Sequence, residues 1–213
     1  IGRACSLWVT APFGGAIPTT AAVPNNTTTG AMGQADSSGV QRLAQVAVSL
    51  GQSAHLVIAD RLSHQGGLSA TVTTAQTTNL PTSALTRYTD GVGVFAAIEI
   101  YTQIGTTATT VTATYTNSGG TGSRVTPLTQ SGASGYREAG RLIILPLQEG
   151  DSGVKSVESV TVASTTGTAG AFGVTLFKPL VALPIPGNGG QQLLFDSLQS
   201  GGGVMPVFPN GAC

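Results

Sequence analysis

The sequence predicts an all-β protein: an antiparallel β-sandwich or jelly-roll-like domain with an extended arm at each end. Three observations predict it. In the middle of the chain, apolar and polar residues alternate with period two over many short segments, which is the pattern of half-buried strands. Turn sequences rich in glycine and serine separate these segments, and helical spacing is rare. Both ends lose the alternation. We place the boundaries at residues 1–51, 52–183 and 184–213.

The first 51 residues form the predicted N-terminal arm. The stretch "TAPFGGAIPTTAAVPNNTTTGAMGQADSSG" holds too few apolar residues to bury a core of its own. Trp8 and Phe13 are the aromatic residues of this arm, and we expect them to be anchored on their own domain or on a neighbouring subunit. The following "VQRLAQVAVSLG" has the i, i+3, i+4, i+7 spacing of a short helix, although its alternating valines also fit a strand.

The middle zone carries the strand signals, most clearly in "GVGVFAAIEIYTQIGTTATTVTATYTNSGG". Here Ile98 and Ile100 share one face and Glu99 and Tyr101 the other, and the later "TTVTATYTN" alternates threonine with Val, Ala and Tyr. Two such runs around a glycine-containing loop predict a hairpin. Turns are predicted at "SHQGG", "NSGGTGS", "QEGDSG" and "STTGTAG". Further strands are predicted at 54–58, 69–74, 141–147, 157–164 and 170–180.

The last zone, "PIPGNGGQQLLFDSLQSGGGVMPVFPNGAC", is a second predicted arm. Apolar residues stand between glycine-rich linkers there, and ordering such a segment costs entropy that burial against a neighbour must offset. We therefore propose partner-binding anchors in both arms. They are Trp8, Phe13, Phe195, Met205 and Phe208, and packing on their own domain is the equally weighted alternative.

Composition excludes several function classes. Only 8% of the residues are charged, and nine basic residues balance nine acidic ones, whereas about 25% are charged in ordinary soluble domains. No basic stripe exists to bind nucleic acid. The apolar runs are much shorter than the roughly 18–20 residues that span a membrane, and "IGRACSLWVTAPFGG" shows no charged-then-apolar leader. A neutral surface favours association or a location outside the cell.

The stretch "HLVIADRLSHQGGLSA" places Asp60, Ser63 and His64 within five residues and raises the question of a hydrolase. A nucleophilic triad needs its members to converge in space, whereas consecutive strand residues point to opposite faces. No G-x-S-x-G elbow in a strand–helix context is present. We therefore predict no catalytic site here, but a strand followed by a polar turn, with Asp60 and Arg61 paired to neighbours.

The remaining polar residues nominate neither a metal nor a cofactor. Glu149 and Asp151 could contribute to a cation site, but a tight turn is the more ordinary interpretation. The run "YREAGR" alternates charge, and either ion pairs between subunits or a solvated face would explain it. Cys5 and Cys213 lie far apart in sequence; we favour reduced thiols over a disulfide. No Cys/His cluster has metal-ligand spacing.

Three long stretches carry a resemblance: "LVIADRLSHQGGLSATVTTAQT", "ALTRYTDGVGVFAAIEIYTQIGTTATTVTATYTN" and "REAGRLIILPLQEGDSGVKSVESVTVASTTGTAGAFGVTLFKPL". They cover roughly residues 55–185 and resemble structural proteins of tailed bacteriophages, most closely capsid cement (decoration) proteins. The resemblance implies a β-rich, non-enzymatic subunit, often a homotrimer. Such a subunit binds the major capsid protein on the outside of an icosahedral shell, or the connector, after assembly in the host cytoplasm. It implies no functional role for particular residues.

Two other classes stay open. One is a different virion component, such as a collar, tail or fibre protein. The other is a receptor-binding or carbohydrate-binding β-sandwich, which needs an exposed aromatic platform. With one tryptophan in the chain, such a platform would have to come from Tyr88, Tyr101, Tyr115 or Tyr136. A depolymerase is the least favoured of the alternatives.

Overall fold

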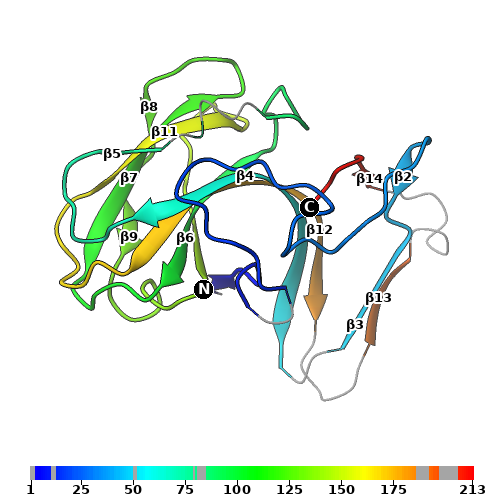
Figure 1. Ribbon diagram of the computed structural model, residues 1–213, viewed down its shortest axis with the longest axis horizontal. Helices are drawn as coiled ribbons and strands as arrows, with labels where there is room; N and C mark the ends of the chain where they lie inside the picture. Colours follow the sequence, from blue (N-terminus) through cyan, green and yellow to red (C-terminus); the bar gives the residue numbers. More distant parts are fainter. Residues whose placement is uncertain are drawn as a thin grey trace.

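The computed structural model describes residues 3–10, 13–49, 52–78, 80, 85–185, 192–196 and 206–213, with 47–49 and 192–196 described by their backbone. These residues form β-strands joined by turns and loops (Figure 1). They contain no α-helix, and so no helix long and apolar enough to cross a membrane.

Two antiparallel five-stranded sheets pack face to face. The order of the first, sheet I, is β1-β10-β6-β12-β4. In the second, sheet II, the order is β5-β11-β7-β8, and β9 also pairs with β7. The strands of sheet I are β1 (Ala4–Cys5), β10 (Arg141–Ile144), β6 (Phe95–Thr102), β12 (Ala171–Ile185) and β4 (Ala54–Leu68). Those of sheet II are β5 (Gln76–Thr77), β11 (Val154–Val162), β7 (Thr109–Asn117), β8 (Arg124–Val125) and β9 (Thr129–Ser131).

The strands are paired in a nested order. Within the sandwich β4 pairs with β12, β5 with β11, β6 with β10 and β7 with β8, so that early strands pair with late ones. This order, with the strands divided between two sheets, is the jelly-roll arrangement. The predicted fold class is therefore confirmed.

The core lies between the two sheets and comes from the alternation that the sequence shows. On β7, Val111, Ala113 and Tyr115 are buried, and the threonines between them are half-buried. Ile98 and Ile100 of β6 pack in the same core from the opposite sheet. The apolar faces thus meet each other, and burial of their surface is the main force that holds the sandwich together.

The predicted hairpin between β6 and β7 is wrong. β6 belongs to sheet I and β7 to sheet II, and neither pairs with the other. The loop between them crosses from one sheet to the other and buries Ile104 in the core. Gly105 lies so close to the backbone of Thr166 that a Cβ would be 1.8 Å from the Thr166 carbonyl oxygen. Gly105, which in the sequence suggests a tight turn, instead allows the loop between the sheets to pack closely against the backbone of Thr166.

Three further local predictions are corrected. The "SHQGG" stretch is no turn, because β4 runs without interruption from Ala54 to Leu68. Residues 69–74 form a turn region, and the short strand of this part is β5. The helical alternative for residues 43–50 is also wrong, because the described part of that segment holds a strand, β3 (Gln45–Ser49). The alternating valines were the better signal.

The two chain ends pair with each other. Strand β2 (Gln41–Arg42) pairs with β14 (Val207–Phe208), and β3 pairs with β13 (Gln192–Asp196). We call these four strands the arm lobe. It stands beside the outer ends of β4 and β12 (Figure 1), where Leu183 and Ile185 are buried although they lie outside the main core. At this end of sheet I, β12 and β13 come close to each other.

Candidate functional site

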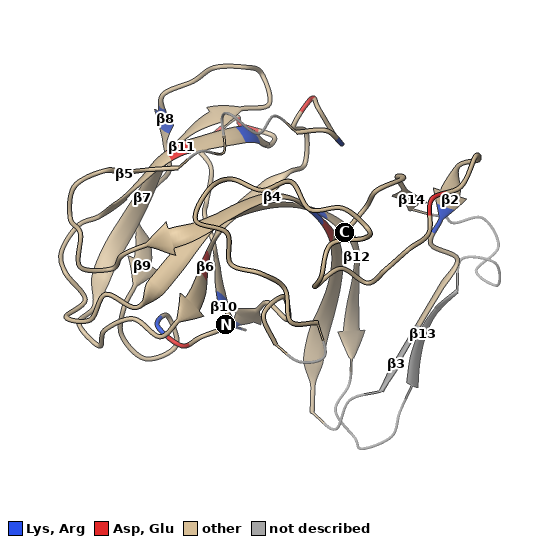
Figure 2. Cartoon of the chain, viewed as in Figure 1, with Lys and Arg blue, Asp and Glu red and all other residues tan. Residues whose placement is uncertain are grey.

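Charged residues are few along the chain (Figure 2), and a buried ion pair stands on the outer face of sheet I. Arg61 of β4 donates from Nη1 to Glu99 Oε2 at 2.7 Å and from Nη2 to Oε1 at 3.0 Å. The Glu99 side chain is 0% exposed. This two-point geometry is the strongest form of a guanidinium–carboxylate contact, and it joins β4 to β6 across the intervening β12.

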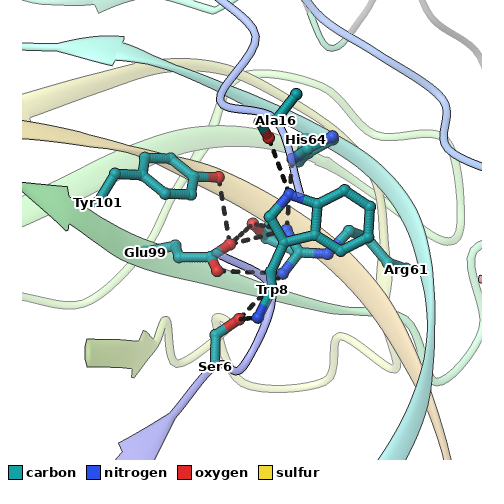
Figure 3. A network of polar contacts seen from close by, with 8 residues as sticks. Ser6, Trp8, Ala16, Arg61, His64, Glu99 and Tyr101 are labelled. Atoms are coloured by element: carbon teal, nitrogen blue, oxygen red, sulfur yellow. Dashed lines mark hydrogen bonds and ion pairs between the residues drawn. The ribbon is translucent and has the colours of Figure 1, made fainter. Parts of the chain in front are cut away.

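Further hydroxyl groups satisfy the pair (Figure 3). Thr175 of β12 donates to Glu99 Oε2 at 2.5 Å, and Tyr101 donates to the same oxygen at 3.2 Å. Ser6 Oγ accepts from Arg61 Nη2 at 3.1 Å. Because buried charges are costly unless they are paired and hydrogen-bonded, this set of partners is what allows a carboxylate at the centre of the sheet.

The electrostatics hold the pair in its ionised form. Burial alone would raise the pKa of Glu99, but Arg61 outweighs burial and lowers the pKa to about 2. Burial would lower the pKa of Arg61, whereas Glu99 raises it above its ordinary value. Burial, followed by the negative charge of Glu99, raises the pKa of Tyr101. Glu99 is therefore a fixed anion at neutral pH, unsuited to exchanging a proton there.

Trp8 of the N-terminal segment covers this network. The Arg61 guanidinium carbon lies 4.4 Å from the centre of the indole ring, a cation–π contact. The ring meets His64 edge to face at 5.0 Å, and its Nε1 donates to the Ala16 carbonyl at 2.8 Å. Trp8 is 6% exposed. A Cβ on Gly15 would lie 2.3 Å from the indole, so only glycine fits there.

The N-terminal segment also completes the hydrogen bonding of β4, which is the edge strand of sheet I. The Gly66 amide donates to Pro18 O at 2.7 Å. Ala22 and His64 exchange both of their backbone hydrogen bonds, at 2.9 and 3.0 Å. An open edge invites pairing with another chain. Here residues 18–22 occupy it.

A second ion pair lies one residue along β4. Arg87 donates to both carboxylate oxygens of Asp60 at 2.8 Å, and it also reaches the carbonyls of Pro24 and Arg61 at 3.2 and 3.0 Å. The Cys213 amide donates to Asp60 Oδ1 at 2.9 Å. The prediction that Asp60 and Arg61 are paired to neighbours is confirmed. These pairs join segments that are distant in sequence.

The three residues that raised the question of a hydrolase do not converge. Asp60 is engaged by Arg87, and Ser63 Oγ is buried with no hydrogen-bond partner among the described residues. His64 Nδ1 lies 3.4 Å from Arg61 Nη1. Burial, and then the positive charge of Arg61, lowers the pKa of His64 to about 4. No described base is placed to activate Ser63, as a triad would require.

The other candidate polar sites also resolve into structural contacts. Asp151 accepts from Arg124 at 2.6 Å and from Asn117 at 2.7 Å, and the Tyr115 hydroxyl donates to it as well. Within the described ranges no group of three potential metal ligands comes together. Arg141 lies 3.6 Å from Glu138 of the same chain. Both cysteines are free.

The five predicted anchors lie in different environments. Trp8 packs on its own domain, and Phe13 is half-buried. Phe208 is half-buried and lines a groove together with Met32, Leu43 and Ile58. The side chain of Phe195, in β13, and all of Met205 lie outside the described residues.

Two of the four tyrosines proposed for a sugar-binding platform are unsuited to it. Tyr101 and Tyr115 are buried. Tyr88 is half-buried, and Tyr136 is exposed. An aromatic platform needs ring faces that a sugar can reach, so the buried pair contributes nothing to one in this structure.

Sequence reasoning missed Glu99 and Thr175 as partners of Arg61. One signal existed: a glutamate in the middle of the apolar run "FAAIEIYT" has to be paired if its face is covered.

Comparison of the chain with protein-family models, with curated proteins and with solved structures found no match. A functional assignment therefore has to start from the residues and their geometry.

Proposed function

We propose that this protein is a non-enzymatic structural subunit of a virion, a cement or decoration protein that binds the outside of a bacteriophage capsid. In this role it stabilises the shell by spanning neighbouring capsomers, and it acts as a homo-oligomer, with a trimer as the expected form. The observation that carries the proposal is the arm lobe, which combines both chain ends beside a jelly-roll sandwich.

The lobe and the segment that leads into β2 have the surface that such a contact needs. Met32 is 66% exposed and Val40 is 71% exposed. Met32 also lines the groove formed with Leu43, Ile58 and Phe208. Exposed apolar residues gathered beside a groove mark a site of interaction more often than single scattered ones. Burial of these side chains against a capsomer would supply the free energy of attachment.

The rest of the surface suits a protein that lives among neighbours. Only 8% of the residues are charged, and the outer face of β7 presents half-buried threonines. Jelly rolls also occur in viral capsid proteins and in lectins, so the fold is compatible with the proposal but does not by itself select it. Many weak contacts on a symmetric shell would add up to firm attachment.

The test measures the mass of the purified protein by light scattering, alone and after mixing with bare shells of the phage that encodes it. We expect an oligomer that saturates the shells and protects them against heat. The double substitution Met32→Asp/Val40→Asp should abolish attachment and leave the jelly roll folded. Leu128→Asp, at an equally exposed site (71%) between β8 and β9, is the matched control and should attach normally.

Other outcomes point to other functions. A ring of higher order with no affinity for shell faces would contradict the cement role and favour a collar or tail protein. A monomer that ignores the shells would favour the carbohydrate-binding alternative, which a glycan array then tests.

A further inference from the structure

We infer that the site on β4 covered by Trp8 binds the N-terminal arm of a second copy of this chain as well as its own arm, so that neighbouring subunits can exchange arms. We call the site the arm receptor: Arg61, His64 and Gly66 of β4, Glu99 of β6 and Thr175 of β12. The inference rests on the proposed function in one respect, because a crowded assembly provides the neighbours.

The arm receptor is made by strands of the jelly roll. Arg61 and Glu99 hold each other across sheet I through their paired hydrogen bonds, and Thr175 fixes Glu99 from β12. None of these contacts uses the arm. The arm therefore meets a site that the sandwich itself orders, whichever chain supplies it.

The arm binds in the manner of an added peptide strand. Pro18 and Ala22 hydrogen-bond to the open edge of β4, and Trp8 places its ring over Arg61. Main-chain hydrogen bonds along an edge, together with one anchored aromatic side chain, form a recurring mode of peptide recognition. These contacts lie within residues 6–22, and the pairing of β1 with β10 extends the docking to Ala4 and Cys5.

The connection between the arm and the lobe favours exchange. Residues 32–40 are all exposed, and nine extended residues span up to about 30 Å. Asp36 and Ser37 make hydrogen bonds to Gly211 and Asn210 there, which tie the connection to the other chain end. Departure of the arm breaks the pairing of β1 with β10 and the contact of Ala21 with the core, but removes none of the buried residues that make up the core cluster between the two sheets.

A second copy is the occupant that the chemistry selects. The contacts of a neighbour's arm are identical to those of the chain's own arm. The own-arm and exchanged forms therefore differ only in whether the arm and its receptor are linked through the same chain. A flexible tether gives an effective concentration of the order of millimolar. Own-chain docking is thus favoured in dilute solution, whereas packed copies on a shell reach a comparable local concentration.

Disulfide trapping tests the exchange directly. A Cβ on Gly67 would lie 3.6 Å from Thr19 Cβ, which is within disulfide range. In a Cys5→Ser/Cys213→Ser background, a Thr19→Cys chain is mixed at high concentration with a Gly67→Cys chain under mild oxidation. We expect a covalent two-chain product that accumulates with time.

Two controls make the trapping decisive. The double variant Thr19→Cys/Gly67→Cys should close within one chain, which shows that position 67 accepts cysteine despite its φ of +80°. Thr19→Cys mixed with Leu128→Cys reports random collision. If the double variant closes but the mixed single variants give no more product than this collision control, the arms do not exchange.

Fluorescence gives an independent measurement, because Trp8 is the single tryptophan. A Cβ on Gly66 would lie 2.5 Å from Ile17 Cγ2 and 3.1 Å from the Tyr101 ring, so Gly66→Val should displace the chain's own arm and shift Trp8 emission to the red. An excess of Trp8→Ala chains, which offer open receptors, should restore the blue emission. Chains carrying both substitutions should not restore it, and a mixture that stays red in every case contradicts exchange.

The two proposals fail separately. Loss of exchange with normal binding to shells would overturn this inference and leave the cement role intact. Exchange in solution without binding to shells would overturn the cement role and leave this inference intact.

Discussion

The outer faces of the two sheets differ in an unexpected way. The outer face of sheet I carries Arg61, Glu99 and Tyr101, all buried beneath the N-terminal arm. On the outer face of sheet II, β7 carries half-buried, uncharged threonines. Ordinary soluble domains place charge on the open surface and keep it out of covered positions. This protein uses part of its small set of charges internally, to fix the arm and the register of the strands.

The difference also separates two kinds of surface chemistry. A buried ion pair contributes little net stability but penalises every arrangement that leaves one partner alone, so it selects one geometry. Threonine hydroxyls fit a pleated surface without desolvating a charge. The covered face is therefore specific for the arm, whereas the open face of β7 presents threonines, one of which, Thr116, donates to Glu158 of the neighbouring β11.

Removal of the anion should have the largest effect on the covered face. Glu99→Gln leaves the Arg61 charge buried and unpaired, and we expect the free energy of unfolding to fall by about 3–5 kcal/mol. Denaturant titration measures it. The double variant Arg61→Met/Glu99→Leu removes both charges and should recover most of the loss. A loss below about 1 kcal/mol for Glu99→Gln would falsify the view that the pair fixes this sheet.

Removal of the cover should have the next largest effect. Trp8→Ala deletes a buried aromatic ring, and a loss of about 3 kcal/mol is expected. Hydrogen exchange at the Gly66 and His64 amides should speed up, because their acceptors, Pro18 and Ala22, lie in the released arm. The neighbouring exposed Leu7 is the matched control: Leu7→Ala should change stability by less than about 0.5 kcal/mol. Equal effects at both positions would contradict a docked arm.

Acid should weaken the covered face through His64. Its pKa is about 4 in the folded chain and about 6.5 when unfolded, so only the unfolded chain takes up a proton between these values. Stability is complete above about pH 6.5 and falls as the pH drops toward 4, by up to about 3 kcal/mol. Glu99, with a folded pKa of about 2, loses its own contribution as the pH falls further.

Stability measured by denaturant titration across this pH range checks the assignment to His64. His64→Gln should remove the slope between pH 6.5 and 4. His55→Gln, at an exposed position of the same strand, should retain it. A slope that persists without His64 would place its origin elsewhere in the molecule.

The same substitution on both faces gives the smallest and most direct comparison. Thr175→Val removes the hydroxyl that donates to Glu99 and should cost about 2 kcal/mol, because hydrogen bonds to charged groups are the expensive ones to lose. Thr112→Val, on the open face of β7, should change stability by less than about 0.5 kcal/mol. Equal values from thermal unfolding would mean that the two faces do not differ energetically.

Local patterns predicted much of the fold and little of the candidate site. The alternation on β7 identified its buried and open faces because period two is a property of a single strand. Short apolar runs and glycines are compatible with more than one local structure. This is why residues 43–50 fitted both a helix and a strand, and why "SHQGG" was wrongly predicted to be a turn. Asp60 and Arg61 were expected to be paired, but their partners Arg87 and Glu99 lie 27 and 38 residues away.

The sequence by itself determined the all-β class and the faces of its clearest strands, because each follows from local composition and periodicity. Only the tertiary structure decided that β4 pairs with β12, that β6 and β7 lie in different sheets and that both faces of β6 are buried. Strand pairing depends on contacts such as Val174 with Gln65, more than a hundred residues apart, and no local period encodes them. The burial of Glu99 likewise exists only because a distant segment folds over its sheet.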